Sequence, residues 1–166
     1  MTEYKAQSKG LLSFDVTRND KFIGRLSYKN WYSFKASVEL ADNSTYQIEE
    51  KGFWGTTIEL KHNEKLLLNF KMNWNGDIII QTYFDRAEAD YVFKHKGFLK
   101  ESYVLLDRKG TELLVMKPDL NWRKLNYNYQ LTTTNEFDEF SNSKILLFTV
   151  LHCANYYVSA AGSAGS

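Results

Sequence analysis

The sequence predicts a closed antiparallel β-barrel of about twelve strands around one buried C-terminal α-helix. Apolar and polar residues alternate through most of residues 11–134, turn residues divide the alternating runs at hairpin spacing, and an almost uncharged segment follows the last run. The chain has 166 residues, 43% of them hydrophobic, which is enough apolar mass for one domain with its own core.

The alternation of period two is typical of strands with one wet and one dry face. It is clearest in residues 22–28, 32–40, 66–72 and 123–132. In the first of these runs, Phe22 belongs with Gly24, Leu26 and Tyr28 on one face. Residues before 135 show no helical period, internal repeat or linker, so we expect ten to twelve strands in one meander.

Turn residues separate the runs. Asn75-Gly76 is the strongest signal and predicts a type I′ turn, because both residue types tolerate positive φ. Arg108-Lys109-Gly110 predicts the connection of another hairpin. Pro118 is expected just after a strand, where a missing N–H does least harm. Further turns are predicted at Asn19-Asp20, Asp42-Asn43-Ser44 and His62-Asn63.

The chain changes character after residue 134. Residues 135–143 are polar and acidic, and Ser141, Asn142 or Ser143 can cap a helix. Residues 144–160 are apolar on nearly all sides, which is typical of a helix in a protein interior. We favour this buried helix over a tail anchor, because the segment contains His152 and Asn155. Residues 161–166 are expected to form a flexible tail.

Closure of the sheet follows from combining these two parts. A sheet of this many strands exposes its edges unless it closes, and a barrel of more than eight strands needs something besides its own side chains inside. A helix about 10 Å across suits that interior. The alternative is a two-sheet sandwich with the helix packed on one face.

The strand-rich residues 11–134, the hairpin VLLDRKGTELLVM of residues 104–116 and the segment ILLFTVLHCANYY of residues 145–157 together resemble the tubby-like superfamily. That superfamily includes tubby C-terminal domains, phospholipid scramblases and LURP-one-related proteins. The resemblance implies a twelve-stranded barrel around a central helix and binding of anionic phospholipid or phosphoinositide headgroups. The sequence lacks the cysteine-rich stretch of scramblases, an Asp-x-Asp calcium loop and the C-terminal signature of true tubby proteins, and no binding residue carries over by alignment.

Catalysis and metal binding have little support in the sequence. The single cysteine, Cys153, excludes an intramolecular disulfide. Its neighbour His152 cannot pair with it on a helix, because adjacent side chains point about 100° apart, so Cys153 is interpreted as a core thiol. The other histidines, His62 and His95, lie far from it in sequence and from each other. We therefore expect a protein that is not an enzyme and has no cofactor or metal.

The distribution of charged residues along the chain indicates the candidate residues for binding an anionic ligand. The formal net charge of +1 argues against a globally basic nucleic-acid binder, yet residues 91–130 hold eight basic and four acidic residues. Lys94 and Lys96 share a strand face by the period of two. Trp122, beside Arg123 and Lys124 in the sequence, suits a membrane interface. The candidate residues for an anionic membrane surface or phosphoinositide are Lys94, Lys96, Lys100, Trp122, Arg123 and Lys124.

Two other functions stay open at this point. One is a protein-interaction scaffold, in which Trp31, Trp54 and Trp74 form an exposed patch. The other is a carrier that holds a small hydrophobic ligand in a cavity beside the helix. The polar N-terminus, without the apolar run of a signal peptide, predicts a cytoplasmic protein that can associate peripherally with membranes.

Overall fold

The computed structural model describes residues 1–10, 12–30, 35–52, 57–84, 88–97, 102–121 and 126–163, with the backbone alone at 120–121, 126–127 and 158–163. Its strands are β1 (Thr2–Ser8), β2 (Ser13–Arg18), β3 (Lys21–Tyr28), β4 (Ala36–Leu40), β5 (Thr45–Lys51), β6 (Thr57–His62), β7 (Lys65–Met72), β8 (Ile78–Thr82), β9 (Ala89–Lys96), β10 (Ser102–Leu106), β11 (Glu112–Asn121) and β12 (Asn126–Thr133). Its helices are α1 (Asn135–Glu139) and α2 (Ser143–Ser163).

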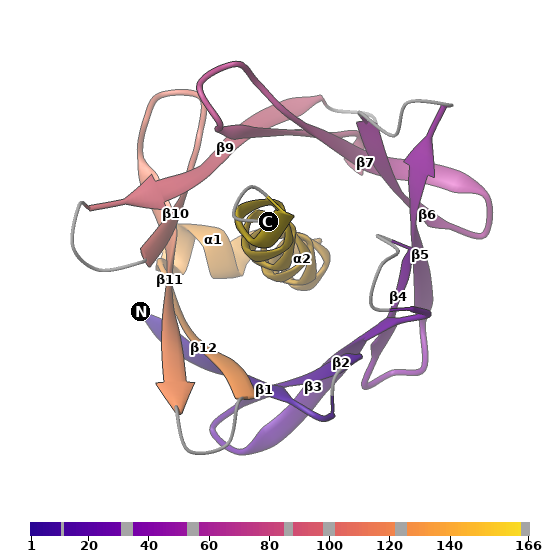
Figure 1. Ribbon diagram of the computed structural model, residues 1–166, viewed down its shortest axis with the longest axis vertical. Coiled ribbons are helices and arrows are strands. Elements are labelled where there is room, and N and C mark those ends of the chain that lie inside the picture. The colour runs from indigo at the N-terminus through magenta and orange to yellow at the C-terminus, as the bar shows by residue number, and fades with distance from the viewer. Residues whose placement is uncertain are drawn as a thin grey trace.

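The twelve strands close into one barrel (Figure 1). Each strand pairs antiparallel with its neighbours in sequence, and β1 closes the ring by pairing with β12 from Thr2↔Thr133 to Ala6↔Tyr129. Every strand therefore has two partners, and the sheet has no open edge. The predicted closed barrel is confirmed, and the two-sheet sandwich is wrong.

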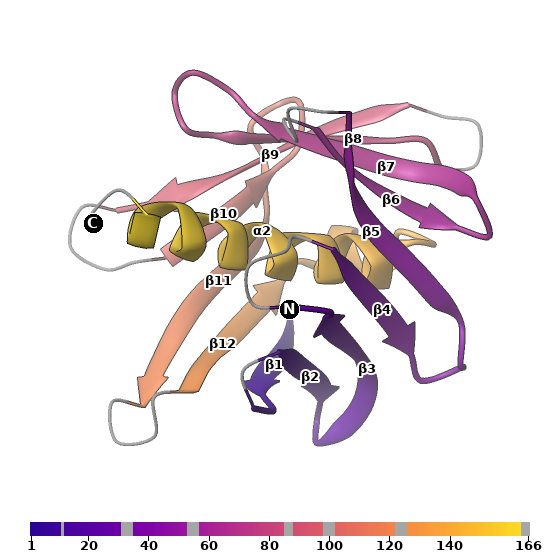
Figure 2. The same cartoon turned by 45° about the vertical axis from the view of Figure 1, so that its right-hand side comes forward.

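Helix α2 lies inside the ring of strands, as Figures 1 and 2 show from two directions. Residues 145–154 are at most 3% exposed, which confirms the prediction of a buried helix. The helix runs through Ser163, so residues 161–163 are not the flexible tail we expected; the strong helix propensity of Ala160 and Ala161 accounts for the extension. Among the described residues, no helix is both long and apolar enough to cross a membrane.

Successive strand connections lie by turns at one end of the barrel and at the other, because consecutive strands are antiparallel neighbours. The connections β1–β2, β3–β4, β5–β6, β7–β8, β9–β10 and β11–β12 share the end toward which α2 runs, which we call the exit end. The N-terminus, α1 and the other five strand connections share the opposite end, the entry end. This division places each surface residue discussed below.

The barrel wall carries bulges that the sequence alternation does not reveal. Register shifts between Val16 and Thr17 of β2, so that Val16 lies opposite Gly24 whereas Thr17 lies opposite Phe22. Ile23 is thus the extra residue of a β-bulge. Phe22 is 40% exposed, which corrects its predicted place on the face of Gly24.

Two predicted details of the connections are wrong. Gly76 has a φ of +81°, but Asn75 does not have the positive φ that a type I′ turn requires. Instead, the Gly76 N–H donates to the Asn73 carbonyl at 3.1 Å, and the Asn73 N–H donates to the Asp77 carbonyl at 2.8 Å. Successive positive φ values occur at the turns Asn19-Asp20 and Asn63-Glu64.

Pro118 lies within β11, opposite Tyr129 of β12, and not after a strand as predicted. The recorded pairing of β11 with β10 ends at Met116, whereas the pairing with β12 continues to Asn121. The described pairing with β10 thus ends two residues before the proline, which has no backbone N–H to donate.

Gly24 sets how closely α2 approaches the barrel wall. A Cβ atom at this position would lie 2.6 Å from the carbonyl oxygen of Glu39 and 2.9 Å from Cζ of Phe148 on α2. Both distances are far shorter than a normal contact between these atoms. The missing side chain therefore gives the Phe148 ring its place against β3.

We expect Gly24→Ala to lower the free energy of unfolding by about 1–3 kcal/mol, the usual cost of inserting a methyl group into a filled interior. Chemical denaturation measures the change. Gly10→Ala is the control, because no described atom lies within 4 Å of a Cβ there. Its expected loss of stability is only the cost of about 1–2 kcal/mol of placing an alanine in the left-handed backbone region. A smaller loss at Gly24 than at Gly10 would contradict this account of the packing.

Candidate functional site

A polar contact links the buried helix to the barrel wall. The Tyr28 hydroxyl at the end of β3 lies 2.8 Å from Nδ1 of His152, and Nδ2 of Asn155 donates to the same hydroxyl at 2.9 Å. The Tyr129 hydroxyl of β12 donates to Oδ1 of Asn155 at 3.2 Å. These bonds give Nδ1 of His152 and the amide of Asn155 partners among the barrel side chains, one of the two interpretations that the sequence leaves open.

His152 is neutral in this setting. The Tyr28 hydroxyl accepts from Asn155 and has one proton and a second lone pair left, so it can pair with Nδ1 of His152 in either tautomer of the neutral ring. Nε2 is buried and has no hydrogen-bond partner among the described residues. Burial lowers the pKa of His152 from 6.5 to about 3, because a charged imidazolium there would lose its hydration.

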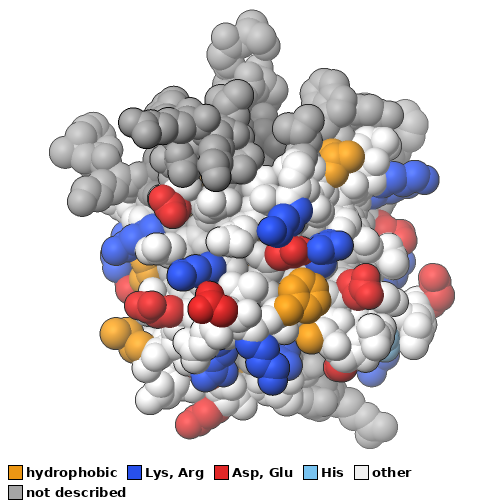
Figure 3. Space-filling model, turned by 90° about the horizontal axis from the view of Figure 1, so that it is seen from below, with side chains coloured by type: hydrophobic (Ala, Val, Ile, Leu, Met, Phe, Trp, Pro, Cys, Tyr) orange, Lys and Arg blue, Asp and Glu red, His pale blue; other side chains and the backbone are white. Residues whose placement is uncertain are grey.

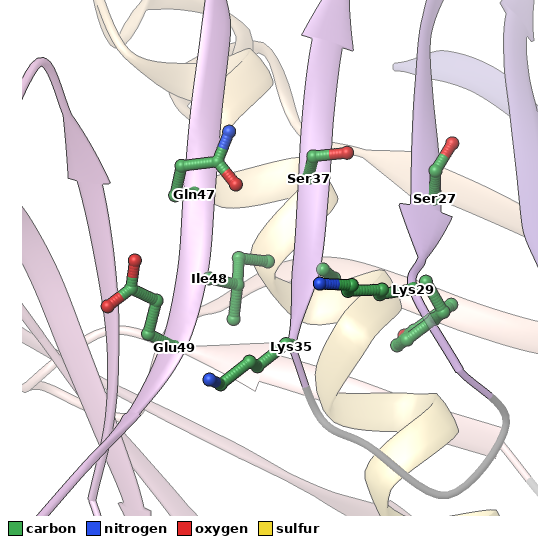
Figure 4. A pocket seen from close by; sticks show the side chains of 9 residues that line it. Ser27, Lys29, Lys35, Ser37, Gln47, Ile48 and Glu49 are labelled. Atoms are coloured by element: carbon green, nitrogen blue, oxygen red, sulfur yellow. The ribbon is translucent and has the colours of Figure 1, made fainter.

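Tyr28 also lines an open hollow of about 420 Å³ across the outer side of β3, β4 and β5. Strand register creates the hollow. Ser27 pairs with Ser37, which pairs with Gln47, so two short side chains and an amide form one outward row. Lys29, Lys35 and Glu49 form a second row nearer the strand ends, as Figure 4 shows. The small serines leave space between the longer side chains.

The chemistry of this hollow suits an anion with several oxygen atoms. Two ammonium groups, from Lys29 and Lys35, lie where the β3–β4 connection leaves and rejoins the barrel, and the Lys29 N–H donates to the Lys35 carbonyl at 3.4 Å. The hydroxyls of Ser27 and Ser37 and the amide of Gln47 add neutral donors and acceptors. Our sequence analysis missed these five residues. Their alternation showed that some face outward, but not that three strands bring them together.

Of the six residues predicted from sequence, the structure describes two. Lys94, half-buried, and Lys96, exposed, lie two residues apart on β9, as predicted. Lys96 forms an ion pair with Glu112, at the edge of a second open hollow of about 460 Å³ on the outer side of β9 to β12. Lys100, Trp122, Arg123 and Lys124 lie outside the described residues, so their convergence with Lys94 and Lys96 remains a prediction.

Charge is divided between the two ends of the barrel. Among the described connections and the terminal residues of their strands, the exit end has the carboxylate of Asp77 and five lysines, which we call the basic rim: Lys9, Lys29, Lys35, Lys51 and Lys96. Carboxylates further along the strands also reach these lysines: Glu49 lines the hollow with Lys29 and Lys35, and Glu59 and Glu112 pair with Lys51 and Lys96. The entry end, with α1 included, has five basic side chains against nine carboxylates: Asp20, Asp42, Glu64, Glu88, Asp107, Glu112, Glu136, Asp138 and Glu139.

One side of the barrel lacks this separation of charge. On the face seen in Figure 3, over β1, β2 and β3, Lys and Arg side chains are interspersed with Asp and Glu. Arg25 Nε lies 2.5 Å from Oδ1 of Asp15 there. The excess of lysines over carboxylates at the exit-end connections is therefore not found on this face of the barrel.

Some rim lysines already have partners. Lys51 Nζ lies 3.1 Å from Oε1 of Glu59, and Lys96 pairs with Glu112. Such exposed pairs contribute about 0–1 kcal/mol, so an incoming phosphate can compete for these lysines. Lys9 and Lys29 have no ion-pair partner within the described part of the chain.

Other candidate chemistry has less structural support. Cys153 is fully buried, and burial raises the pKa of its thiol well above the usual value, as expected for a core thiol. In the part of the chain that the structure describes, no group of three or more His, Cys, Asp or Glu side chains is arranged to hold a metal ion. A third hollow, of about 250 Å³, is lined by Phe84, Tyr91, Phe140 and Leu146 at the entry end.

Comparison with known proteins gives no match on which an inference could be based. No family model, no curated protein and no solved structure matches it. Functional inference therefore rests on the geometry above.

The pKa of His152 predicts acid sensitivity. Unfolded His152 takes up a proton below pH 6.5, but folded His152 does so only near pH 3. The stability contributed by this residue is complete above pH 6.5 and is lost as the pH falls toward 3, by up to about 1.4 kcal/mol per pH unit. Denaturant titrations from neutral pH to about pH 5 measure the loss.

The control is His152→Gln, which retains an acceptor for Tyr28 but does not titrate. We expect its unfolding free energy to depend less steeply on pH than that of the wild type. Parallel pH curves for the two proteins would show that His152 is not the group responsible.

Proposed function

We propose that this protein is a non-enzymatic binding module for the headgroups of anionic phospholipids, phosphoinositides included. The hollow across β3, β4 and β5 is the observation that carries the proposal. Lys29 and Lys35 supply positive charge for a phosphate, while Ser27, Ser37 and Gln47 supply partners for phosphate or inositol oxygens. Its volume of about 420 Å³ lies within the range of sites that hold small molecules.

The basic rim supports the same proposal. A lysine close to an anionic membrane surface contributes about 1 kcal/mol of attraction, so the five lysines together favour such a surface by several kcal/mol before their existing ion pairs are broken. This attraction falls at high salt, because the screening length shortens to about 3 Å at 1 M. The carboxylates of the entry end would meet repulsion at the same surface, which favours one orientation.

The six residues named from sequence belong to this proposal as a second contact region. Lys96 is a member of the basic rim, and Lys94 lies two residues before it on β9. Lys100 and Trp122–Lys124 follow, in sequence, strands that end at the exit end. We propose that they extend the headgroup-binding surface from β3–β5 around the rim.

Specific observations favour the two alternatives less. For a scaffold, Trp74 is fully exposed, whereas Trp31 and Trp54 lie outside the described residues. For a carrier, the hollow of about 250 Å³ beside Leu146 is apolar, but it is smaller than the hollow that carries the two lysines. The proposal therefore remains with the charged hollow.

The test is co-sedimentation with vesicles of phosphatidylcholine alone, with phosphatidylserine, or with phosphatidylinositol bisphosphate. We expect binding only to the anionic vesicles, weaker at high salt, and at least about tenfold weaker in Lys29→Glu/Lys35→Glu, because two charges near the surface are reversed. Lys94→Glu/Lys96→Glu tests the second contact region in the same assay.

A matched control is Lys21→Glu/Lys65→Glu, which makes the same change in net charge at the entry end. We expect it to bind nearly as well as the wild type. Equal losses in the two pairs would reduce the effect to net charge, and an absence of wild-type binding at low salt would remove the proposed function.

A further inference from the structure

The β7–β8 hairpin presents a tryptophan at the end of the barrel that carries the basic rim. Trp74 is fully exposed. It follows β7 directly after Asn73, and its neighbour Met72 is also among the exposed large hydrophobic residues. A tryptophan side chain normally buries about 150–250 Å² of its surface. Because Trp74 buries almost none of it within the protein, we looked for a partner that would cover the ring.

The hairpin that carries Trp74 is held in a defined conformation. The Asn73 side-chain oxygen Oδ1 accepts from the N–H of Asn75 at 2.9 Å and from the N–H of Asp77 at 3.0 Å. The Tyr157 hydroxyl on α2 donates to the Gly76 carbonyl of the same turn and lies 3.2 Å from the Phe93 carbonyl. The turn is therefore tied directly to the buried helix.

Tyr157 is itself fixed by its surroundings. Its ring stacks on Tyr103 with centroids 5.7 Å apart and lies 4.6 Å from the His95 ring. Trp74 consequently needs no ordering of its backbone before it meets a partner, which reduces the entropy cost of binding.

The chemistry around Trp74 identifies that partner as a lipid bilayer. Tryptophan favours the membrane–water interface, where its ring is apolar and its indole N–H finds polar groups. Lysines of the rim share this end of the barrel, and their long side chains can place ammonium groups at headgroup level. One exposed ring at the end of the barrel that carries the five rim lysines, with Asp77 as the only described carboxylate of its own connection, fits an anionic bilayer better than the broad apolar patch typical of protein interfaces.

The sequence agrees with this orientation. Trp31, Trp54 and Trp122 each follow a strand that ends at the exit end. These three residues lie outside the described part of the chain and are not included in the site. Trp74 alone, with the rim lysines, carries the inference.

We propose that the Trp74 hairpin inserts into the interface of an anionic bilayer and so holds the exit end of the barrel against the membrane. The inference rests on the proposed function, and it adds a contact with the bilayer that a soluble headgroup cannot provide. The headgroup site and the inserted tryptophan are then two separate contributions to one membrane-bound state.

The experiment compares wild type, Trp74→Ser and the control Phe22→Ser, which removes another exposed aromatic residue at the entry end. Each is titrated with vesicles of phosphatidylcholine and phosphatidylinositol bisphosphate, and separately with soluble inositol trisphosphate. A substitution that removes an aromatic ring buried in a bilayer is expected to weaken vesicle binding by at least about tenfold. We expect that loss only in Trp74→Ser, with inositol trisphosphate binding unchanged in all three.

The outcomes separate the two proposals. Wild-type binding to vesicles that persists in Trp74→Ser would overturn the insertion and leave the headgroup module standing. A loss of both vesicle and inositol trisphosphate binding in Trp74→Ser would also overturn it, because the residue would then act in the headgroup site. Absence of wild-type binding to either probe would overturn the proposed function together with the insertion.

Discussion

The fold depends on the contact between the buried face of the barrel and helix α2. Twelve strands enclose more space than their own side chains fill, and residues 145–154 of α2 occupy it with almost no exposure. The helix is apolar on all sides because the barrel surrounds it on all sides. Gly24 shows how exact the fit is, since a single methyl group there would meet both the wall and the Phe148 ring.

The polar groups on α2 add direction to this apolar contact. Side chains packed by hydrophobicity alone tolerate some rotation of the helix, whereas the bonds of Tyr28 and Tyr129 with Asn155, and of Tyr28 with His152, satisfy their partners in one arrangement. Tyr157 makes a similar link to the β7–β8 turn. The position of the helix and the position of the exit-end surface are thus coupled through hydrogen bonds.

The proposed functions depend on the way the barrel groups its strand connections at two ends. Antiparallel neighbours send alternate connections to opposite ends, so lysines that are scattered in sequence gather at one end while carboxylates gather at the other. The hollow of β3–β5 and Trp74 belong to the same end. A module of this shape can meet a charged surface in a preferred orientation without a conformational change.

The sequence by itself determined the fold class, the buried helix and the expectation of closure, because these depend on local patterns: the period of two, the apolar segment after residue 143 and the need to cover sheet edges. It placed no strand before residue 11, so the tertiary structure alone revealed β1, which closes the ring against β12. Only the tertiary structure decided the bulge that exposes Phe22, the turn at Asn73–Gly76 and the place of Pro118 within β11. The candidate site, too, was predicted from the sequence only in part. Sequence periodicity placed Lys94 and Lys96 on one face, but strand register joined Ser27, Ser37 and Gln47. Register and bulges arise from pairing between distant segments, and a single residue's shift moves side chains to the other face, which no local pattern records.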